Sequence, residues 1–263
     1  LLLNKLVINS NNYIDDKKLN NTDSLKRSFS LKSEYDISDK SAIAITTEYY
    51  DNEFGVPLHF VSSPTNGNEN FRNWRFTDWR RGAVNIIYNY QSSAFALKTR
   101  LFLDKFKNEL LQKWVTTKTN FEGDTYSQVV SKYDDALFGG NIVFKKEYND
   151  NSLEFSFNFK EDKHSEQSKT TEPYLDFIAR TFSVGNLNTI VLSEDLKFFV
   201  GASYDIFDKV KAQELVNNKA QDFDTEIIGK TVTAFNPYST FQYSISANDL
   251  ISFAFARKIR FPS

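Results

Sequence analysis

The stretch of sequence that decides the fold is NSLEFSFNFKED, residues Asn151–Asp162. Its apolar side chains stand at every second position, at Leu153, Phe155, Phe157 and Phe159. The positions between them are polar or charged. A β-strand sends successive side chains to opposite faces, whereas a helix would mix these two sets. We therefore predict a strand with one apolar face and one wet face.

The same period recurs in Leu196–Ile206, where only Phe199 interrupts the polar row. Along the chain, short polar turns alternate with long polar loops, and the segments between them alternate in hydropathy. This arrangement is typical of an antiparallel, up-and-down β-barrel that spans a membrane, with short turns on the periplasmic side and long loops outside. We predict an all-β fold of that class.

Eleven strands are predicted, and the eighth contains a bulge near Arg180, where its apolar period slips. Pro237 has no ladder donor, so we expect it at a bulge or near a strand end. An amphipathic piece, Lys209–Asn217, predicts a short helix inside a long loop. The predicted strands are Leu1–Asn9, Leu25–Ile37, Ser41–Asp51, Arg81–Gln91, Ala94–Phe106, Ala136–Tyr148, Asn151–Asp162, Tyr174–Leu192, Leu196–Ile206, Thr231–Ile245 and Leu250–Phe261.

Composition agrees with a barrel strand that exposes only alternate residues to lipid. The 263 residues contain 25 Phe and 13 Tyr, concentrated in or beside the alternating segments, where aromatic girdles occur. There is no run of eighteen apolar residues, and the mean hydropathy is −0.48. The alternative is a soluble β-sandwich with a Phe-rich core, but sandwich strands are usually shorter, about five or six residues.

Several classes of function find no support in the sequence. The chain has no cysteine for disulfides or thiolate metal sites, and its formal charge of −2 offers no basic surface for nucleic acid. The two histidines, His59 and His164, fall in predicted loops without metal-ligand spacing, and we interpret them as solvated residues. We expect neither an enzyme nor a bound metal or cofactor.

One predicted loop carries a dense cluster of Trp74, Arg75, Trp79, Arg80 and Arg81. Guanidinium groups can hold an anionic ligand by charge-assisted hydrogen bonds, and the indole rings can stack on its flat parts. These five residues are therefore our candidate ligand-binding site. Alternatively, the tryptophans belong to the interfacial girdle and the arginines contact lipid phosphates or lipopolysaccharide.

Short motifs in several strands give the chain a family resemblance. They are Phe235-Asn236-Pro237-Tyr238, Phe241-Gln242-Tyr243-Ser244, Phe253-Ala254-Phe255-Ala256-Arg257, Ile259-Arg260-Phe261-Pro262 and, more loosely, Gly201-Ala202-Ser203-Tyr204-Asp205 and Gly55-Val56-Pro57. In these segments the chain resembles the barrel of TonB-dependent outer-membrane receptors, in which a strand ending in an Arg-x-Pro element rises to the surface.

The resemblance implies a twenty-two-stranded barrel in the bacterial outer membrane, plugged by an N-terminal globular domain. Such a receptor takes up a scarce small-molecule nutrient, such as a ferric siderophore, haem, cobalamin or an oligosaccharide, with energy passed through TonB. It would be surrounded by outer-membrane lipid and lipopolysaccharide. Residues 1–263 are then a partial barrel domain without the plug, and TonB would act through a plug domain that this chain does not contain.

Eleven antiparallel strands leave two open edges whose backbone groups could not be exposed to lipid, so we expect further strands in the full protein or in a partner. Two other hypotheses stay open. One is a plugless outer-membrane channel or autotransporter translocator, completed to twelve strands. The other is a soluble β-rich binding module.

Overall fold

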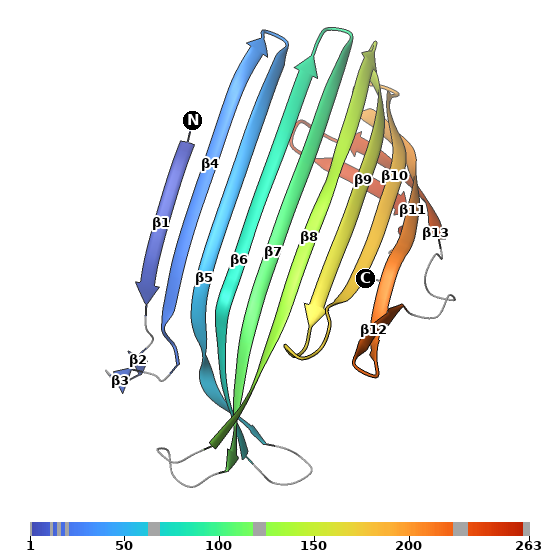
Figure 1. Ribbon diagram of the computed structural model, residues 1–263. Coiled ribbons are helices and arrows are strands. Elements are labelled where there is room, and N and C mark those ends of the chain that lie inside the picture. Colours follow the sequence, from blue (N-terminus) through green and yellow to red (C-terminus); the bar gives the residue numbers. More distant parts are fainter. Residues whose placement is uncertain are drawn as a thin grey trace.

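The protein is a single large antiparallel sheet in the computed structural model (Figure 1). The structure describes residues 2–10, 13–14, 17–18, 21–62, 69–117, 125–222 and 231–259, and side chains within 21–56, 74–113, 128–222 and 231–259. Eleven strands pair in chain order: β1 (Leu2–Ser10), β4 (Ser24–Ser38), β5 (Ser41–Ser62), β6 (Glu69–Gln91), β7 (Phe95–Thr117), β8 (Thr125–Tyr148), β9 (Asn151–Gln167), β10 (Leu175–Val191), β11 (Leu196–Val216), β13 (Thr231–Ser244) and β14 (Leu250–Ala256).

Three short strands complete the topology. β12 (Lys219–Asp222) folds back on β11, and β2 (Tyr13–Ile14) pairs with β3 (Lys17–Lys18) apart from the main sheet. In the part of the chain that the structure describes, no helical segment has the length and apolarity needed to span a membrane.

The sheet curves strongly but does not close. Its strand order runs from β1 at one end to β14 at the other, and β10 to β14 turn behind the front strands in Figure 1. The short turns after β4, β6 and β8 gather at the top of that view, and these strands run from there toward the bottom. The predicted antiparallel sheet of eleven consecutive strands is confirmed, whereas a barrel of twenty-two strands stays a prediction.

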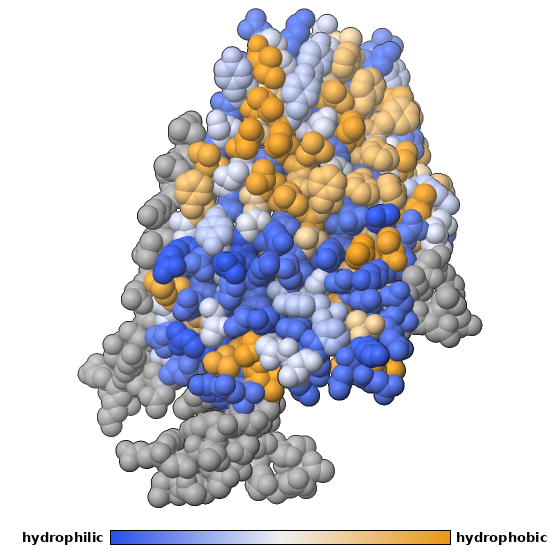
Figure 2. All heavy atoms as spheres, in the orientation of Figure 1, coloured by the Kyte–Doolittle hydropathy of each residue, from blue (hydrophilic) through white to orange (hydrophobic). Residues whose placement is uncertain are grey.

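Register and alternation define two faces of the sheet, because residues directly opposite each other on paired strands point the same way. We call the convex face that carries Phe29, Val84 and Phe157 the outer face, and the opposite one the inner face. These three side chains are 38%, 37% and 43% exposed, and most other exposed large apolar residues share their face. Figure 2 shows them as a continuous apolar band over the half of the strands nearest the short turns.

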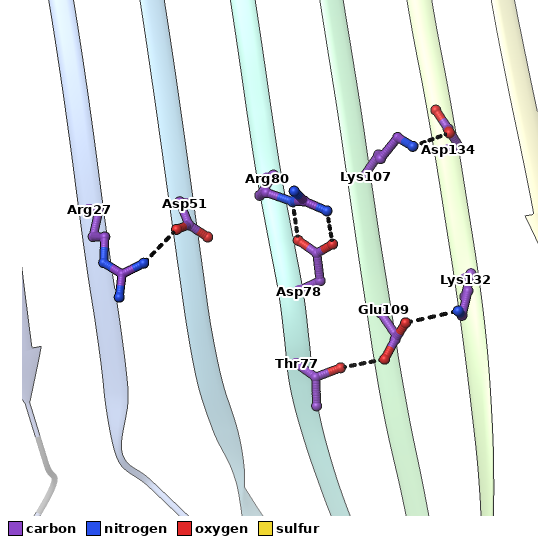
Figure 3. Close-up of polar contacts among 9 residues, drawn as sticks. All are labelled: Arg27, Asp51, Thr77, Asp78, Arg80, Lys107, Glu109, Lys132 and Asp134. Atoms are coloured by element: carbon purple, nitrogen blue, oxygen red, sulfur yellow. Dashed lines mark hydrogen bonds and ion pairs between the residues drawn. The ribbon is translucent and has the colours of Figure 1, made fainter.

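Below the band, the same outer face becomes charged within one alternation step. On β4 the change falls between Phe29 and Arg27, and on β9 between Phe159 and Glu161. Cross-strand ion pairs join the charged residues, with 3.2 Å between Arg27 and Asp51. The charged belt shown in Figure 3 comprises Arg27, Asp51, Asp78, Arg80, Lys107, Glu109, Lys132 and Asp134, and Thr77 also contacts Glu109.

The boundary between band and belt crosses the strands obliquely. Through successive pairings Glu161 of β9 lies in the row of Leu31 on β4, four residues beyond Arg27. Over five strand spacings, this displacement corresponds to a strand tilt of about 30°, near the tilt of strands in membrane barrels. The outer row of β11 from Leu196 to Ile206 would then cover about 25–30 Å across the band, close to the expected height of an apolar belt.

The strands run much farther past the band than the sequence predicted. The predicted loops after Asp51 and Phe106 are instead strand as far as Ser62 and Thr117. The predicted helix Lys209–Asn217 is also wrong, because β11 continues to Val216 and turns at Asn217–Asn218, both with positive φ. Beyond the band the outer face is charged and the inner face mixes polar with aromatic side chains, so the alternation of apolar and polar residues disappears although the backbone ladder continues.

Two local irregularities differ from the sequence prediction. A register shift lies near Arg180, between Ile178 and Ala179, but its extra residue is Val210 of β11 and not a residue of β10, which pairs with β9 without a shift. Pro237 lies inside β13, away from a bulge or strand end. Its carbonyl accepts a hydrogen bond from Arg257 N at 3.1 Å, on the side where β14 has just ended. The nitrogen of the same residue points to that side too, so no bond to β11 is lost.

Candidate binding site on the inner face

The predicted ligand-binding cluster lies on strand β6 and not in a loop. Arg75 and Arg80 lie on the outer face, whereas Trp79 and Arg81 lie on the inner face. An extra residue at Thr77, opposite the step from Glu109 to Leu110, shifts the alternation within the cluster. The structure therefore divides these residues between two surfaces.

The outer-face arginines are occupied by carboxylates of the same chain. Arg75 donates two hydrogen bonds to Asp23, at 3.1 and 2.9 Å, and Arg80 makes two to Asp78. Next to Arg75, the backbone carbonyl of Trp74 accepts a hydrogen bond from Asn21 Nδ2 at 2.7 Å. The contacts of Asn21 and Asp23 fasten the segment before β4 to β6, and the Arg80–Asp78 pair lies within β6, so we assign Trp74, Arg75 and Arg80 a structural role here.

On the inner face, Trp79 and Arg81 line a hollow of about 440 Å³. The other lining residues are Glu48, Tyr50, Ala83 and Phe106, from β5, β6 and β7. Tyr50, Arg81 and Phe106 are direct neighbours in the register of three consecutive strands. We call this hollow the inner pocket, and its volume lies in the range of small-molecule sites, about 300–1,000 Å³.

An aromatic stack forms the wall of the inner pocket nearest the long connections. The Trp79 ring packs edge-on against Phe76 at 4.8 Å between centroids and against Phe106 at 5.1 Å. Phe54 stacks on Phe76 at 4.7 Å. Such pairs stabilise each other beyond the burial of their area, so Trp79 is held in place before any ligand arrives.

The charges in the inner pocket are unevenly matched. Arg81 Nε lies 2.9 Å from Asp104 Oδ2, and its Nη2 contacts the same carboxylate oxygen. Glu48 has no hydrogen-bond or ion-pair partner among the described side chains. With two carboxylates beside one guanidinium, the local formal charge is −1. The arrangement offers both donors and acceptors without a net positive field.

A second group of aromatic and acidic side chains lies on the inner face, in the register row that contains Tyr50, Arg81 and Phe106. Asp135 is the register neighbour of Phe106, and His164 Nδ1 lies 2.6 Å from Asp135 Oδ1. His164 Nε2 is 3.5 Å from Glu166 Oε2, and the rings of Tyr133 and Phe177 lie 5.6 and 5.9 Å from the imidazole. The described residues contain no group of three or more His, Asp or Glu side chains that could hold a metal ion.

The interpretation of His164 as a solvated loop residue is thus wrong. It lies within β9, with carboxylates on both ring nitrogens, because the strand continues past the apolar band. His59 lies within β5, but its side chain is outside the described residues.

Sequence reasoning missed Glu48, Tyr50 and Phe106 as pocket residues. A signal was available for one pair only. The short turn between Gln91 and Phe95 fixes the register of β6 with β7 and so places Arg81 beside Phe106, whereas no short turn joins β5 to β6 to place Tyr50.

Two of the motifs that carry the family resemblance contact each other. Asn236 Nδ2 donates to Asp205 Oδ2 at 2.6 Å, and Asn236 Oδ1 accepts from Ile259 N at 2.8 Å. Asp205 also accepts from Ser203, at 3.3 Å. These hydrogen bonds join β11, β13 and the segment after β14 on the inner face. The motif residues Asp205 and Asn236 therefore stabilise the sheet at this point.

Comparison with known proteins supports the fold more than any particular role. No family model and no curated protein matches the sequence. Among solved structures, the chain is similar to the copper transporter OprC, with a TM-score of 0.69 and 10% identity, over 97% of this chain and 41% of that one. The translocator domain of the autotransporter NalP from Neisseria meningitidis scores 0.36 at 10% identity, covering 90% of this chain and 76% of that one. The outer-membrane protease OmpT from Escherichia coli scores 0.30 at 11% identity, covering 90% and 85%.

The chain therefore shares its fold with part of the OprC structure, and it forms an open antiparallel sheet of eleven main strands in its described part. The chain spans about two-fifths of the length of OprC, its first structural match.

Proposed function

We propose that this chain is the barrel portion of a TonB-dependent outer-membrane receptor that takes up a scarce small-molecule nutrient, without a chemical step of its own. The observation that carries the proposal is the apolar band on the outer face. It is continuous across the sheet, ends abruptly at the charged belt and is oblique to the strands (Figures 2 and 3). Large exposed apolar surfaces mark membrane or protein interfaces, and an apolar band that ends at a charged belt is the form that lipid contact requires.

The inner face supports transport of a polar molecule. It carries charges of both signs, including Lys98, Arg100 and Glu34, together with the inner pocket. Likeness to the fold of a transporter over nearly the whole chain agrees with this proposal. In the proposed whole protein, about twenty-two strands close the barrel, a plug domain fills it and contacts TonB, and the charged belt faces the headgroups of lipid and lipopolysaccharide.

Uptake assays in the natural bacterium test the proposal. Cells that lack this protein should accumulate at least about tenfold less of one cargo class among ferric siderophore, haem, cobalamin and oligosaccharide at limiting concentration. Removal of TonB should produce the same uptake defect. Restoring the gene for this protein should reverse the defect of the cells that lack it, but not the defect of the cells that lack TonB. Cargo uptake that depends on this protein but continues without TonB would contradict the receptor proposal.

A plugless channel or translocator is the second candidate, because the inner face opposite the apolar band carries charged side chains such as Glu34, Lys98 and Arg100. Planar-bilayer recording separates it from the receptor. The intact purified protein should show no steady large conductance if a plug occupies the lumen, and a stable open pore would favour the channel.

A further inference from the structure

We propose that the inner pocket binds sugar rings of a neutral oligosaccharide, which names the cargo class and rests on the proposed uptake function. The first argument is charge. The cluster read from the sequence suggested an anionic ligand, but Arg75 and Arg80 lie on the other face and Arg81 is committed to Asp104. A pocket whose remaining charged group is Glu48 repels carboxylates and iron-chelating anions.

The second argument is the shape and chemistry of the walls. Trp79 and Phe106 meet at 5.1 Å, and Tyr50 lines the pocket beside them. A pyranose ring has an apolar C–H face that packs on such rings, and hydroxyls around its edge. The carboxylate of Glu48 and the guanidinium of Arg81 can accept from and donate to these hydroxyls without requiring a charge on the ligand.

Two other ligand chemistries compete for this pocket. An organic cation can lie over the aromatic rings near Glu48, but it leaves the remaining N–H donors of Arg81 without an acceptor, so the binding panel below includes choline. A purely apolar ligand would bury the Glu48 carboxylate without a partner, at a large desolvation cost.

The third argument is continuation along the row. Beyond Phe106, the group of Tyr133, His164 and Phe177 presents aromatic rings again, with Asp135 and Glu166 as acceptors. The two groups are about 10 Å apart, two strand spacings, which is a distance that linked sugar units can cover. The inner face therefore offers consecutive subsites, and an oligosaccharide fits better than a monosaccharide.

Binding measurements on the intact natural protein in detergent test this inference. The probes are a panel of neutral tri- to pentasaccharides of gluco, galacto, manno and N-acetylated types, with trigalacturonate, a ferric catecholate siderophore and choline as anionic and cationic comparisons. Tryptophan fluorescence and calorimetry report binding. We expect at least one neutral saccharide to saturate the protein below about 10 mM, more tightly than any charged probe.

Variants locate the site. Trp79→Ala and Glu48→Gln should each weaken saccharide binding at least about fivefold. Arg80→Ala is the matched control, since it adjoins Arg81 in sequence but lies on the outer face, and it should leave affinity unchanged. Glu48→Gln keeps the size of the side chain, so it remains informative if Trp79→Ala fails to fold. Tighter binding of a charged probe, no saturation by any neutral saccharide, or an undisturbed affinity in Glu48→Gln would overturn the inference.

Uptake data separate this inference from the proposed function. TonB-dependent uptake of another cargo by a protein that binds no saccharide would sink the sugar site alone. Saccharide binding at the inner pocket combined with uptake that needs no TonB would instead remove the receptor.

Discussion

Replacing Phe157 with arginine should strongly destabilise the protein in a membrane. Phe157 lies on the outer face of β9, directly between Ile142 of β8 and Val184 of β10 in the register, and is 43% exposed. If this band contacts lipid, a guanidinium there must leave water for hydrocarbon, which costs about 2–4 kcal/mol near the middle of a barrel strand. Guanidinium unfolding of the protein refolded in lipid vesicles measures the loss.

Two matched variants separate charge from packing and depth. Phe157→Leu keeps an apolar side chain at the same place and should cost far less. Thr231→Arg puts the same charge on the outer face of β13 at the belt, where Thr231 already donates to Asp208, and should be close to neutral. Equal losses in Phe157→Arg and Thr231→Arg would mean that the apolar band does not meet lipid.

The second large effect is expected at Gly201, in the middle of β11. A Cβ atom added there would lie 2.2 Å from the backbone oxygen of Asn186 and 3.1 Å from the Cα of Leu187, both on β10. Because backbone atoms of a paired strand cannot rotate away, Gly201→Ala should force β10 and β11 apart. We expect a loss of stability toward the upper end of the range for overpacking, about 1–3 kcal/mol.

Gly82 provides the control within the same sheet. A Cβ atom at Gly82 would approach only Tyr49 Cδ2, at 3.9 Å, which is an ordinary contact. Gly82→Ala should therefore be neutral or slightly stabilising, since alanine restricts the unfolded chain. Comparison of the denaturant midpoints of the two variants is the measurement, and a Gly201→Ala protein as stable as Gly82→Ala would contradict the pairing of β10 with β11.

The sequence predicted the strands wherever the two faces meet different surroundings. Between Phe29 and Ile37 the outer side chains are mainly apolar and the inner ones polar, so alternation was plain and the register followed. On the far side of Arg27 in β4 and of Glu161 in β9, away from the apolar band, the side chains on both faces are mainly polar. The backbone ladder continues there, but the sequence has no alternation of apolar and polar residues to detect. The dipeptide Asn217-Asn218 was the remaining clue in the sequence. Asparagine tolerates positive φ, which both residues adopt, and such dipeptides favour tight hairpin turns over helices.

The candidate site was harder to predict, because a cluster in sequence need not be a cluster in space. On a strand, neighbours such as Arg80 and Arg81 face opposite ways, and the extra residue at Thr77 reverses the alternation again toward Arg75. Conversely, Tyr50, Arg81 and Phe106 are far apart in sequence and adjacent in the sheet. The composition of the cluster suggested an anion site, but Asp23, Asp78 and Asp104 neutralise its arginines.

Cysteine scanning along β9 tests the central claim most directly. The chain contains no cysteine, so each introduced thiol is unique. Positions 155 and 157 on the outer face should resist a charged maleimide in reconstituted vesicles and contact bromolipids that quench an attached fluorophore. Positions 156 and 158, on the inner face, should react with the maleimide and escape quenching. If the odd-numbered positions react as readily as the even-numbered ones, or if neither set meets bromolipid, this sheet does not separate lipid from water.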